Sequence, residues 1–387
     1  MAQAQQGRIL TTELVEGLGL DQAKLAVAAK LSGRSALSLG FDIMRVARGP
    51  QKLLPMEYLG YGLWRKEMTP ERRAQYVSLH TNKAVNERLV SPDADRMASL
   101  MVDKHMTALV LGGMGLPVPH SKAIFSPDIG YGALHRLTTA EALADYITRP
   151  ENLPLFGKPV AGSRSLGAIS ILSAAGGDVT LGDGREVSAR ALAGEVAQAF
   201  PRGWILQDLI RSDPVLQKVT GPALAALRFV TIWGAQGPEP FYALWRLPAK
   251  GAMTDGVVSG TNIMAELDPL TGVVRKARYG DYVTGHAASH ALIHPEEPLI
   301  GVQIPHWARV NEVVIEGHRA FPGHGLLGWD VAVTAAGPVV TEINSNPLHT
   351  LFQRGVDEGF KTPERMARVD QVASLLRARM ARFAGRA

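Results

Sequence analysis

The stretch Gly328-Trp-Asp-Val-Ala-Val-Thr-Ala-Ala-Gly-Pro-Val-Val-Thr-Glu-Ile-Asn-Ser-Asn-Pro347 decides how the rest of the chain is interpreted. Its Val, Ile and Thr residues favour the pleated strand, and its Gly and Pro residues favour a turn. The pattern predicts two short β-strands at 328–334 and 339–344, joined by a turn at 335–338. We therefore expect a hairpin at this point of the chain.

Three polar side chains interrupt this otherwise apolar hairpin. Side chains alternate across a strand, so Glu342 and Asn344 share one face. A pairing of Val333 with Val339 would place Asp330 opposite Glu342. Two neighbouring carboxylates repel each other, and a bound Mg²⁺, which prefers oxygen ligands, would remove that repulsion. The alternative is a hairpin whose polar face simply meets water.

Composition excludes several classes of protein. The chain has 387 residues, 46% hydrophobic and 20% charged, which is typical of a globular protein with two or three subdomains. Its net charge of +5 comes with no long basic run, which argues against nucleic-acid binding. The absence of cysteine excludes thiolate metal sites, Cys nucleophiles and disulfides. The N-terminal residues lack a signal-peptide pattern and segment 106–118 is too short to cross a bilayer, so we expect a cytoplasmic protein without a membrane partner.

Residues 1–95 are predicted to be a helical N-terminal region. A helical spacing of apolar residues ends near Ser32-Gly33, and a second helix is expected from Ser35 to Arg48. The pair Thr69-Pro70 predicts the start of a third helix that reaches about Leu79. No strand followed by GxGxxG occurs here, so a Rossmann domain is not supported. A packing or interaction domain is the favoured interpretation.

Helices and strands are expected to be mixed along the rest of the chain, which predicts an α+β fold. The predicted helices are 91–111, 138–146, 187–199, 307–320 and 363–384. The predicted strands are 122–125, 155–160, 168–172, 204–210, 227–233 and 241–247.

The segment between the strands 155–160 and 168–172 has the composition of a phosphate-binding loop. Residues 162–167 read Gly-Ser-Arg-Ser-Leu-Gly, and Lys158 precedes them. Backbone N–H groups of such a turn can point at phosphate oxygens, and the lysine adds positive charge. The segment is not a Walker A loop, because G-x-x-x-x-G-K-[ST] is absent. A plain hairpin loop is the alternative.

The order of these parts resembles the ATP-grasp superfamily. Lys104 precedes Lys158 and its loop, and the strand at 204–210, Arg228 and the hairpin at 328–347 follow. Over roughly residues 95–350 the chain is most similar to the sugar-transfer-associated ATP-grasp branch, which is related to α-L-glutamate-ligase-like enzymes. The hairpin is the most specific part of the resemblance. Ile304-Pro-His-Trp307 and Leu227-Arg-Phe-Val-Thr231 also fit that branch.

The resemblance implies a binding site for ATP and two Mg²⁺ ions, with Mn²⁺ as the alternative ion. The residues implied to bind ATP are Lys104, Lys158, Gly162, Ser163, Ser165, Gly167, Gln207, Asp208, Leu209 and Asp213. In this set, residues 207–209 would pair with the adenine edge and Asp213 would bind the ribose hydroxyls. The implied metal ligands are Asp330, Glu342 and Asn344. The implied catalytic residues are Arg228 and Arg246, and the implied substrate contacts are Asn262 and Asn346.

The resemblance also implies an ATP-grasp fold and a reaction. The helical N-terminal region would end at residue 95, an ATP-grasp part with a lid would span 96–205, and a sheet domain with the metal site and the last helix would span 206–387. The implied reaction joins a small-molecule carboxylate to an amine through an acyl-phosphate. Phosphoryl transfer of this kind needs neutralised charge more than a protein nucleophile. The alternatives are an ATP-grasp kinase and a non-catalytic nucleotide-binding partner in polysaccharide assembly, and a homodimer is left open.

Two groups of histidines are weaker candidates. His286, His290 and His294 recur every four residues and would line one face of a helix as metal ligands, but Gly and Pro bracket the segment. His318 and His324 are expected in a loop at the edge of the active site.

Overall fold

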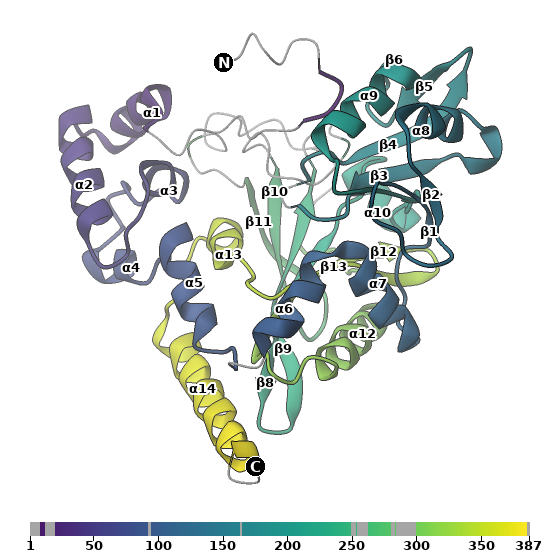
Figure 1. Ribbon diagram of the computed structural model, residues 1–387. Coiled ribbons are helices and arrows are strands. Elements are labelled where there is room, and N and C mark those ends of the chain that lie inside the picture. The colour runs from purple at the N-terminus through teal and green to yellow at the C-terminus, as the bar shows by residue number, and fades with distance from the viewer. Residues whose placement is uncertain are drawn as a thin grey trace.

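The computed structural model describes residues 8–11, 20–91, 94–162, 165–248, 253, 262–279, 283 and 299–384. In these ranges two β-sheets and the helices around them form a mixed α+β architecture (Figure 1), as the sequence predicts. Within the same ranges, no helix is both long enough and apolar enough to cross a membrane.

Five helices lie within residues 20–91, as predicted for the N-terminal region, and the first three pack around a core of their own. The five helices are α1 (Gln22–Ser32), α2 (Ala36–Arg48), α3 (Pro55–Gly60), α4 (Pro70–Ala74) and α5 (Leu79–Glu87). The core shared by α1, α2 and α3 is rich in aromatic residues and includes Tyr58, Tyr61, Trp64 and Tyr76. α1 ends at Gly33, whose φ of 67° needs glycine, and α2 begins after its N-cap Ser35, as predicted.

The third predicted helix is shorter than expected. α4 ends at Ala74 and does not continue to Leu79. The side chain of Gln353, far away in the sequence, accepts the backbone N–H of Val77 at 2.7 Å and donates to its carbonyl at 2.9 Å. Val77 is therefore held outside a helix by a tertiary contact. A new helix, α5, begins only after Ser78 caps it.

The first sheet has seven strands in the order β2-β1-β7-β3-β4-β5-β6. The strands are β1 (Ser121–Phe125), β2 (His135–Leu137), β3 (Leu155–Pro159), β4 (Ile169–Ala175), β5 (Asp178–Leu181), β6 (Glu186–Ser188) and β7 (Trp204–Asp208). They share an apolar core with α8 (Ala140–Ile147) and α9 (Ala189–Ala199), and a 3-10 helix, η3 (Pro150–Asn152), precedes β3. The predicted helix at 187–199 is thus a short strand followed by α9. The predicted boundary between the ATP-grasp part at 96–205 and the sheet domain at 206–387 falls inside β7. Residues on both sides of that domain boundary therefore lie in this sheet.

The second sheet has six strands in the order β11-β10-β9-β8-β12-β13. The strands are β8 (Leu227–Gly234), β9 (Gly237–Leu247), β10 (Ile263–Leu267), β11 (Val274–Tyr279), β12 (Leu326–Thr334) and β13 (Gly337–Asn344). β10 pairs with β11 and β12 pairs with β13, both in antiparallel orientation. The strands β10 and β11 were not predicted from the sequence.

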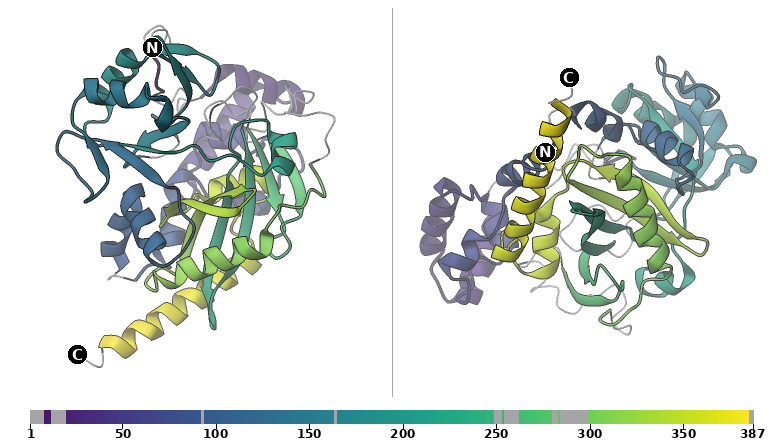
Figure 2. Two further views of the ribbon diagram at one scale, coloured as in Figure 1. Left: turned by 90° about the vertical axis from the view of Figure 1, so that its right-hand side faces the viewer. Right: turned by 90° about the horizontal axis from the view of Figure 1, so that it is seen from below.

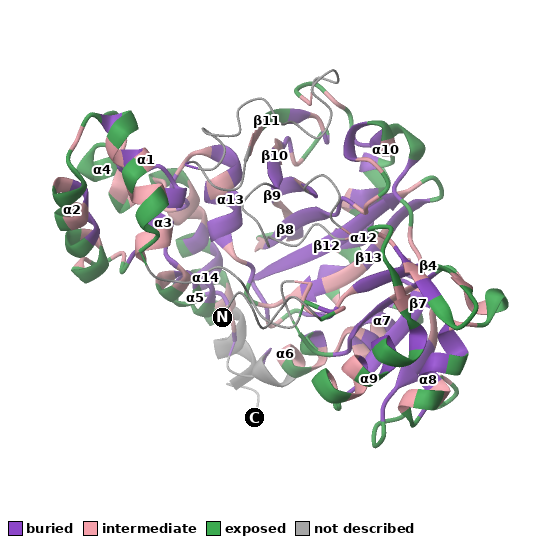
Figure 3. Cartoon of the chain, turned by 90° about the horizontal axis from the view of Figure 1, so that it is seen from above, coloured by how far each residue is buried: buried purple, intermediate pink, exposed green. Residues whose placement is uncertain are grey.

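Helices cover both faces of the second sheet (Figures 1 and 2). One face shares its core with α6 (Asp95–Val102), α7 (Lys104–Gly113), α10 (Pro214–Thr220) and α12 (Trp307–Arg319). The opposite face shares its core with α5, α13 (His349–Val356) and α14 (Pro363–Ala384). As a result β8 and β12 are almost entirely buried (Figure 3). Through α5, the N-terminal region therefore packs against the second face of this sheet.

The β12–β13 hairpin forms with a different register from the one predicted. Val333 pairs with Pro338 and not with Val339, because only Ala335 and Ala336 form the turn. The register then shifts by one residue at Thr341, whose hydroxyl donates to the carbonyl of Asp330 at 3.1 Å. This bulge restores the predicted pairing of Asp330 with Glu342.

The single helix predicted at 91–111 is two helices, α6 and α7, separated at Asp103. The carboxylate of Asp103 accepts the N–H groups of His105 and Met106, both at 2.9 Å, so it caps α7. The N–H of Lys104 donates to the carbonyl of Val160 at 3.0 Å. The break therefore ties the start of α7 to the loop after β3.

Candidate active site

A cavity of about 540 Å³ is lined by both sheets and contains most of the predicted site residues. The predicted residues that line it are Lys104, Lys158, Gly162, Ser165, Gln207, Asp208, Leu209, Arg228, Arg246, Asp330, Glu342, Asn344 and Asn346. Gly167, Asp213 and Asn262 do not line it, and Ser163 lies outside the described residues. The structure thus brings together side chains that are up to 242 positions apart in the sequence, from Lys104 to Asn346.

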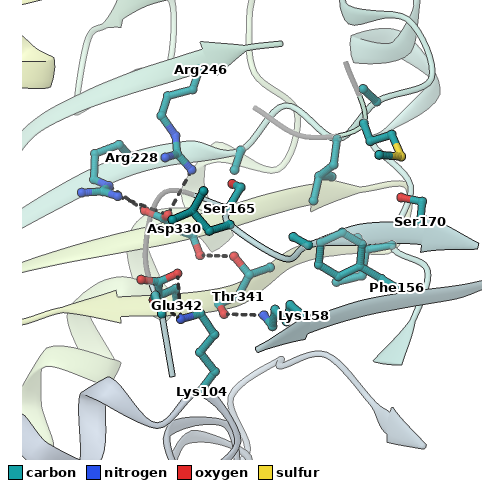
Figure 4. Close-up of a pocket in the computed structure, with 18 of the residues that line it drawn as sticks. Lys104, Phe156, Lys158, Ser165, Ser170, Arg228, Arg246, Asp330, Thr341 and Glu342 are labelled. Atoms are coloured by element: carbon teal, nitrogen blue, oxygen red, sulfur yellow. Dashed lines mark hydrogen bonds and ion pairs between the residues drawn. The ribbon is translucent and has the colours of Figure 1, made fainter. Parts of the chain in front are cut away.

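Neighbouring strands place two arginines against Asp330. Arg228 on β8 lies directly opposite Asp330 on β12, and Arg246 comes from β9. The Nε atom of Arg228 lies 2.6 Å from Oδ1 of Asp330, and Nη2 of Arg246 lies 3.0 Å from Oδ2. Burial alone would raise the pKa of Asp330, but the charges of the two arginines outweigh it and lower the pKa. Asp330 is therefore a carboxylate that orients both guanidinium groups (Figure 4).

The alternation of β8 explains why this charged cluster lies on the face that also carries the N-terminal helices. Leu227 and Phe229 point into the core beneath α12, whereas Val230 and Ile232 point into the core beneath α13 and α14. Side chains two positions apart share a face, so Arg228 belongs to the second face. The cavity and the apolar core beneath α13 are therefore parts of the same face.

Two lysines approach the hairpin from the first sheet and from α7 (Figure 4). The Nζ atom of Lys104 donates to the carbonyl of Gly162 at 2.6 Å and lies 3.8 Å from a carboxylate oxygen of Glu342. The Nζ atom of Lys158 donates to the carbonyl of Thr341 at 3.4 Å. Thr341, at the bulge, thus links the lysine on β3 to the strand that carries Asp330.

Burial changes the ionisation of Lys158. Its side chain is 9% exposed, and burial lowers its pKa to about 8, with the ammonium group of Lys104 acting in the same direction. The carboxylates of Glu342 and Asp330 act in the opposite direction but do not cancel the effect. An anion bound beside this ammonium group would favour its charged form. The site is therefore suited to a highly charged anionic ligand.

The donor atoms of the hairpin fit Mg²⁺ in combination with a phosphate ligand. Asp330 and Glu342 supply carboxylate oxygens and Asn344 supplies an amide oxygen. No group of three or more His, Cys, Asp or Glu that could hold a metal occurs in the described part of the chain. Mg²⁺ commonly binds one or two carboxylates and completes its shell with phosphate and water oxygens. The two carboxylates and one amide are such a set.

The opposite end of the cavity is suited to a flat aromatic group. Phe156 on β3 lies there, away from the arginines (Figure 4), and Leu172 and Leu209 also line the cavity. The side chain of Gln207 is buried and donates to the hydroxyl of Ser121 at 3.2 Å. The backbone N–H of Asp208 donates to the carbonyl of His120 at 3.1 Å, so it is already engaged within the protein.

The loop after β3 is partly described. Gly162 and Ser165 line the cavity, and Ser165 has a φ of 58°, the left-handed conformation typical of a tight turn. Gly167 has a structural role, because a Cβ atom there would lie 2.2 Å from the ring of Phe200. The carbonyl of Gly167 also accepts the indole N–H of Trp204 at 2.8 Å.

Several predicted residues lie elsewhere. The carboxylate of Asp213 caps α10 by accepting the N–H of Val215 at 2.8 Å, and Asn262 is buried just before β10. The expectation for His318 is wrong, because it is fully buried in α12 and pairs with Thr231 at 2.7 Å. His324 is also buried, and the predicted histidine series at 286–294 lies outside the described residues.

Sequence reasoning missed the residues that hold the loop after β13. Nδ2 of Asn86 donates to Oδ1 of Asn346 at 2.6 Å and to the carbonyl of Pro347 at 3.0 Å. Asn82 donates to the same carbonyl at 3.1 Å and accepts the N–H of His349 at 2.8 Å. The Nε2 atom of His349 is 2.7 Å from Oδ1 of Asn86, and burial lowers the pKa of this histidine to about 3. Helix α5 therefore fixes the loop directly after the candidate metal ligand Asn344.

The two sheets, with a charged cluster at one end of the cavity between them, define an ATP-grasp architecture. Residues 85–371 match the family described as sugar-transfer associated ATP-grasp, and the chain belongs to this family. A comparison with curated protein sequences finds no match.

Solved structures of similar fold include several ligases. The ATP-grasp ligase PsnB with a minimal precursor is 16% identical, with a TM-score of 0.38, and the match covers 73% of this chain and 63% of that one. The D-alanine-D-alanine ligase from Coxiella burnetii is 13% identical, with a TM-score of 0.40, and the match covers 74% and 59%. The D-alanine–D-alanine ligase from Bacillus anthracis complexed with ATP is 11% identical, with a TM-score of 0.39, and the match covers 72% and 68%. The chain thus spans about three fifths of the length of PsnB and of the Coxiella burnetii ligase.

Proposed function

We propose that the chain is an ATP- and Mg²⁺-dependent ligase that joins a carboxylate to an amine and releases ADP and phosphate. The observation that supports this most is the gathering of two lysines, two arginines and two carboxylates around one end of the cavity (Figure 4). No cysteine is present in the chain, and charge neutralisation is what phosphoryl transfer chiefly requires.

In this proposal the nucleotide extends from one end of the cavity to the other. Its base would lie against Phe156 and Leu209, and its triphosphate would lie beside Lys104 and Lys158. Mg²⁺ bound by Asp330, Glu342 and Asn344 would neutralise phosphate charge. The backbone of the loop at Gly162 would cover the phosphates.

The proposed chemistry has two steps. A carboxylate oxygen of the substrate attacks the γ-phosphorus, the bond from that phosphorus to the bridging oxygen breaks, and ADP leaves. The nitrogen of the amine then attacks the acyl carbon, and the departing phosphate takes up the proton that the amine loses. Arg228 and Arg246 would hold the charge of the acyl-phosphate, and their contacts with Asp330 would keep both guanidinium groups in position for it.

Hydroxylamine trapping tests this proposal. The protein is incubated with Mg²⁺, ATP, hydroxylamine and a panel of small carboxylic acids, and ADP, phosphate and hydroxamate are measured. A ligase forms all three in equal amounts, whereas Glu342→Gln, the matched control, should form each about 10²-fold more slowly or less. A stable phosphorylated acceptor with no hydroxamate would indicate a kinase. Nucleotide binding without ADP release across the panel would indicate a non-catalytic partner.

A further inference from the structure

The cavity continues past the charged cluster to a wall made by α13 and the N-terminal helices. Thr350, Leu351 and Arg354 line it from α13, at positions that share one face of a helix. Met56 of α3 and Leu79 of α5 line it from the N-terminal region. Figures 1 and 3 show α13 beside α3 and α5. The N-terminal helices are therefore part of the cavity and not a separate appendage.

This wall, made by residues 56, 79, 350, 351 and 354, is held together by buried polar contacts. Both the N–H and the carbonyl of Val77 bind the side chain of Gln353 on α13. Arg65 forms two contacts with Asp357, directly after α13, the longer being 2.9 Å. Several such contacts, made by groups that are partly or fully buried, leave little freedom for one side of the wall to move against the other. The wall is preformed.

Arg354 brings a guanidinium group to this wall. Its Nε atom is buried without a hydrogen-bond partner, but the guanidinium group forms a hydrogen bond with the side chain of Tyr61, and the guanidinium carbon lies 5.9 Å from the centre of that ring. No carboxylate in the described ranges lies within ion-pairing distance of it, whereas Arg65 and Arg365 nearby are paired with Asp357 and Glu358.

The buried carboxylate of Glu57, next to Met56 in the sequence, already accepts hydrogen bonds from the protein. One of its carboxylate oxygens accepts the N–H of Leu54 at 2.8 Å, and the other accepts the N–H of Leu79 at 2.7 Å. Burial raises the pKa of Glu57, although the charge of Arg354 acts in the opposite direction. These oxygens bind the two backbone N–H groups and the hydroxyl of Tyr61, which donates to Oε1 at 3.5 Å, so Glu57 is linked to the guanidinium group through Tyr61 and not by direct contact.

We propose that this wall is a subsite for the non-reacting part of a substrate, with an anionic group, carboxylate or phosphate, bound by Arg354. The partly exposed side chains of Met56 and Leu79, with Leu351, would receive an apolar portion of the same molecule. The assignment rests on the proposed function, because it treats the charged cluster as the place where the reacting group is activated. It predicts that substrates carry a second anionic group beside an apolar part.

The test uses two fluorescent probes of matched shape. 1-Anilinonaphthalene-8-sulfonate has an apolar body with an anionic group, and N-phenyl-1-naphthylamine has the same body without it. Both are titrated into the protein with Mg²⁺ and a saturating non-hydrolysable ATP analogue, so that the nucleotide end is filled. Arg354→Gln should raise the dissociation constant of the anionic probe about tenfold or more and leave that of the neutral probe unchanged. Arg354→Lys should restore most of the affinity.

Arg88→Gln is the matched control, since Arg88 is exposed and pairs with Asp370 away from the cavity. Should Arg354→Gln not fold, Met56→Asp places a negative charge on the same wall and should weaken the anionic probe selectively. Equal affinity of the anionic probe in wild type and both cavity variants would overturn the subsite. Absence of binding by wild type would overturn it as well. Because the probes report binding without turnover, failure of the ligase reaction is recognised separately by the hydroxylamine assay.

Discussion

The low pKa of Lys158 predicts an unusual pH dependence of nucleotide binding. Burial lowers this pKa from 10.5 to about 8, which corresponds to about 3 kcal/mol against the charged form in the ligand-free protein. A triphosphate beside Nζ favours the charged form, so above about pH 8 a proton must be taken up for tight binding. Affinity should therefore fall roughly tenfold for each pH unit above that value.

The stability of the ligand-free protein should change in the opposite direction. The pKa of Lys158 is lower in the folded than in the unfolded state, so between about pH 8 and 10.5 the unfolded chain binds more protons. The contribution of Lys158 to stability consequently rises with pH over the range in which nucleotide affinity falls. Opposite slopes are expected only if one buried ammonium group controls both.

Calorimetric titration with Mg²⁺ and a non-hydrolysable ATP analogue, from about pH 7.5 to about pH 9.5, measures the first slope. This range lies above the ionisation of the terminal phosphate. Lys158→Met removes the titrating group, so its affinity should be weaker and nearly independent of pH. Urea denaturation over the same range measures the second slope. A pH-independent affinity in wild type, or the same fall in Lys158→Met, would refute the role of Lys158.

Three further substitutions test separate parts of the site. Glu342→Ala should lower ADP formation by about 10²-fold or more and change the free energy of unfolding by only about 0.5 kcal/mol, because the side chain is partly exposed; undiminished turnover would remove it from the site. Asp330→Asn leaves two buried guanidinium groups without their counter-ion and should cost about 3–5 kcal/mol in urea denaturation, whereas a loss below about 1 kcal/mol would show that the arginines find other partners. Asn86→Ala removes the contacts to Asn346 and His349 and should cost about 1–3 kcal/mol. It should also lower kcat; an unchanged kcat would show that the loop after the hairpin keeps its position without α5.

Much of the local structure could be predicted from residue type and spacing. Ser35 caps α2 and Gly33 ends α1, because a hydroxyl accepts a free backbone N–H and glycine tolerates positive φ. The α+β class and the hairpin follow from periodicity, which depends only on neighbours in the chain. The lengths of the helices could not be predicted so well. Val77 leaves the helical conformation because Gln353 binds its backbone, and no pattern among the neighbouring residues in the sequence predicts that contact.

The β12–β13 hairpin shows which features could be predicted from the sequence and which could not. An assumed pairing of Val333 with Val339 placed Asp330 opposite Glu342, but Val333 pairs with Pro338 and the Asp330–Glu342 pairing depends on the bulge at Thr341. Only the tertiary structure shows Asp330 between two arginines and Lys158 buried beside the same bulge. Burial and charge pairing set a pKa, and they are produced by strands that are distant in sequence.

The chemical character of the site, oxygen donors on a hairpin with lysines and a Gly/Ser loop upstream, was therefore determined by the sequence itself. The tertiary structure determined which charged groups contact each other and which are neutralised. It also determined that Arg354 and the N-terminal helices line the cavity. The physical reason is that hydrophobic burial beneath α5, α13 and α14 brings these segments together, and polar side chains then interact where that packing leaves them.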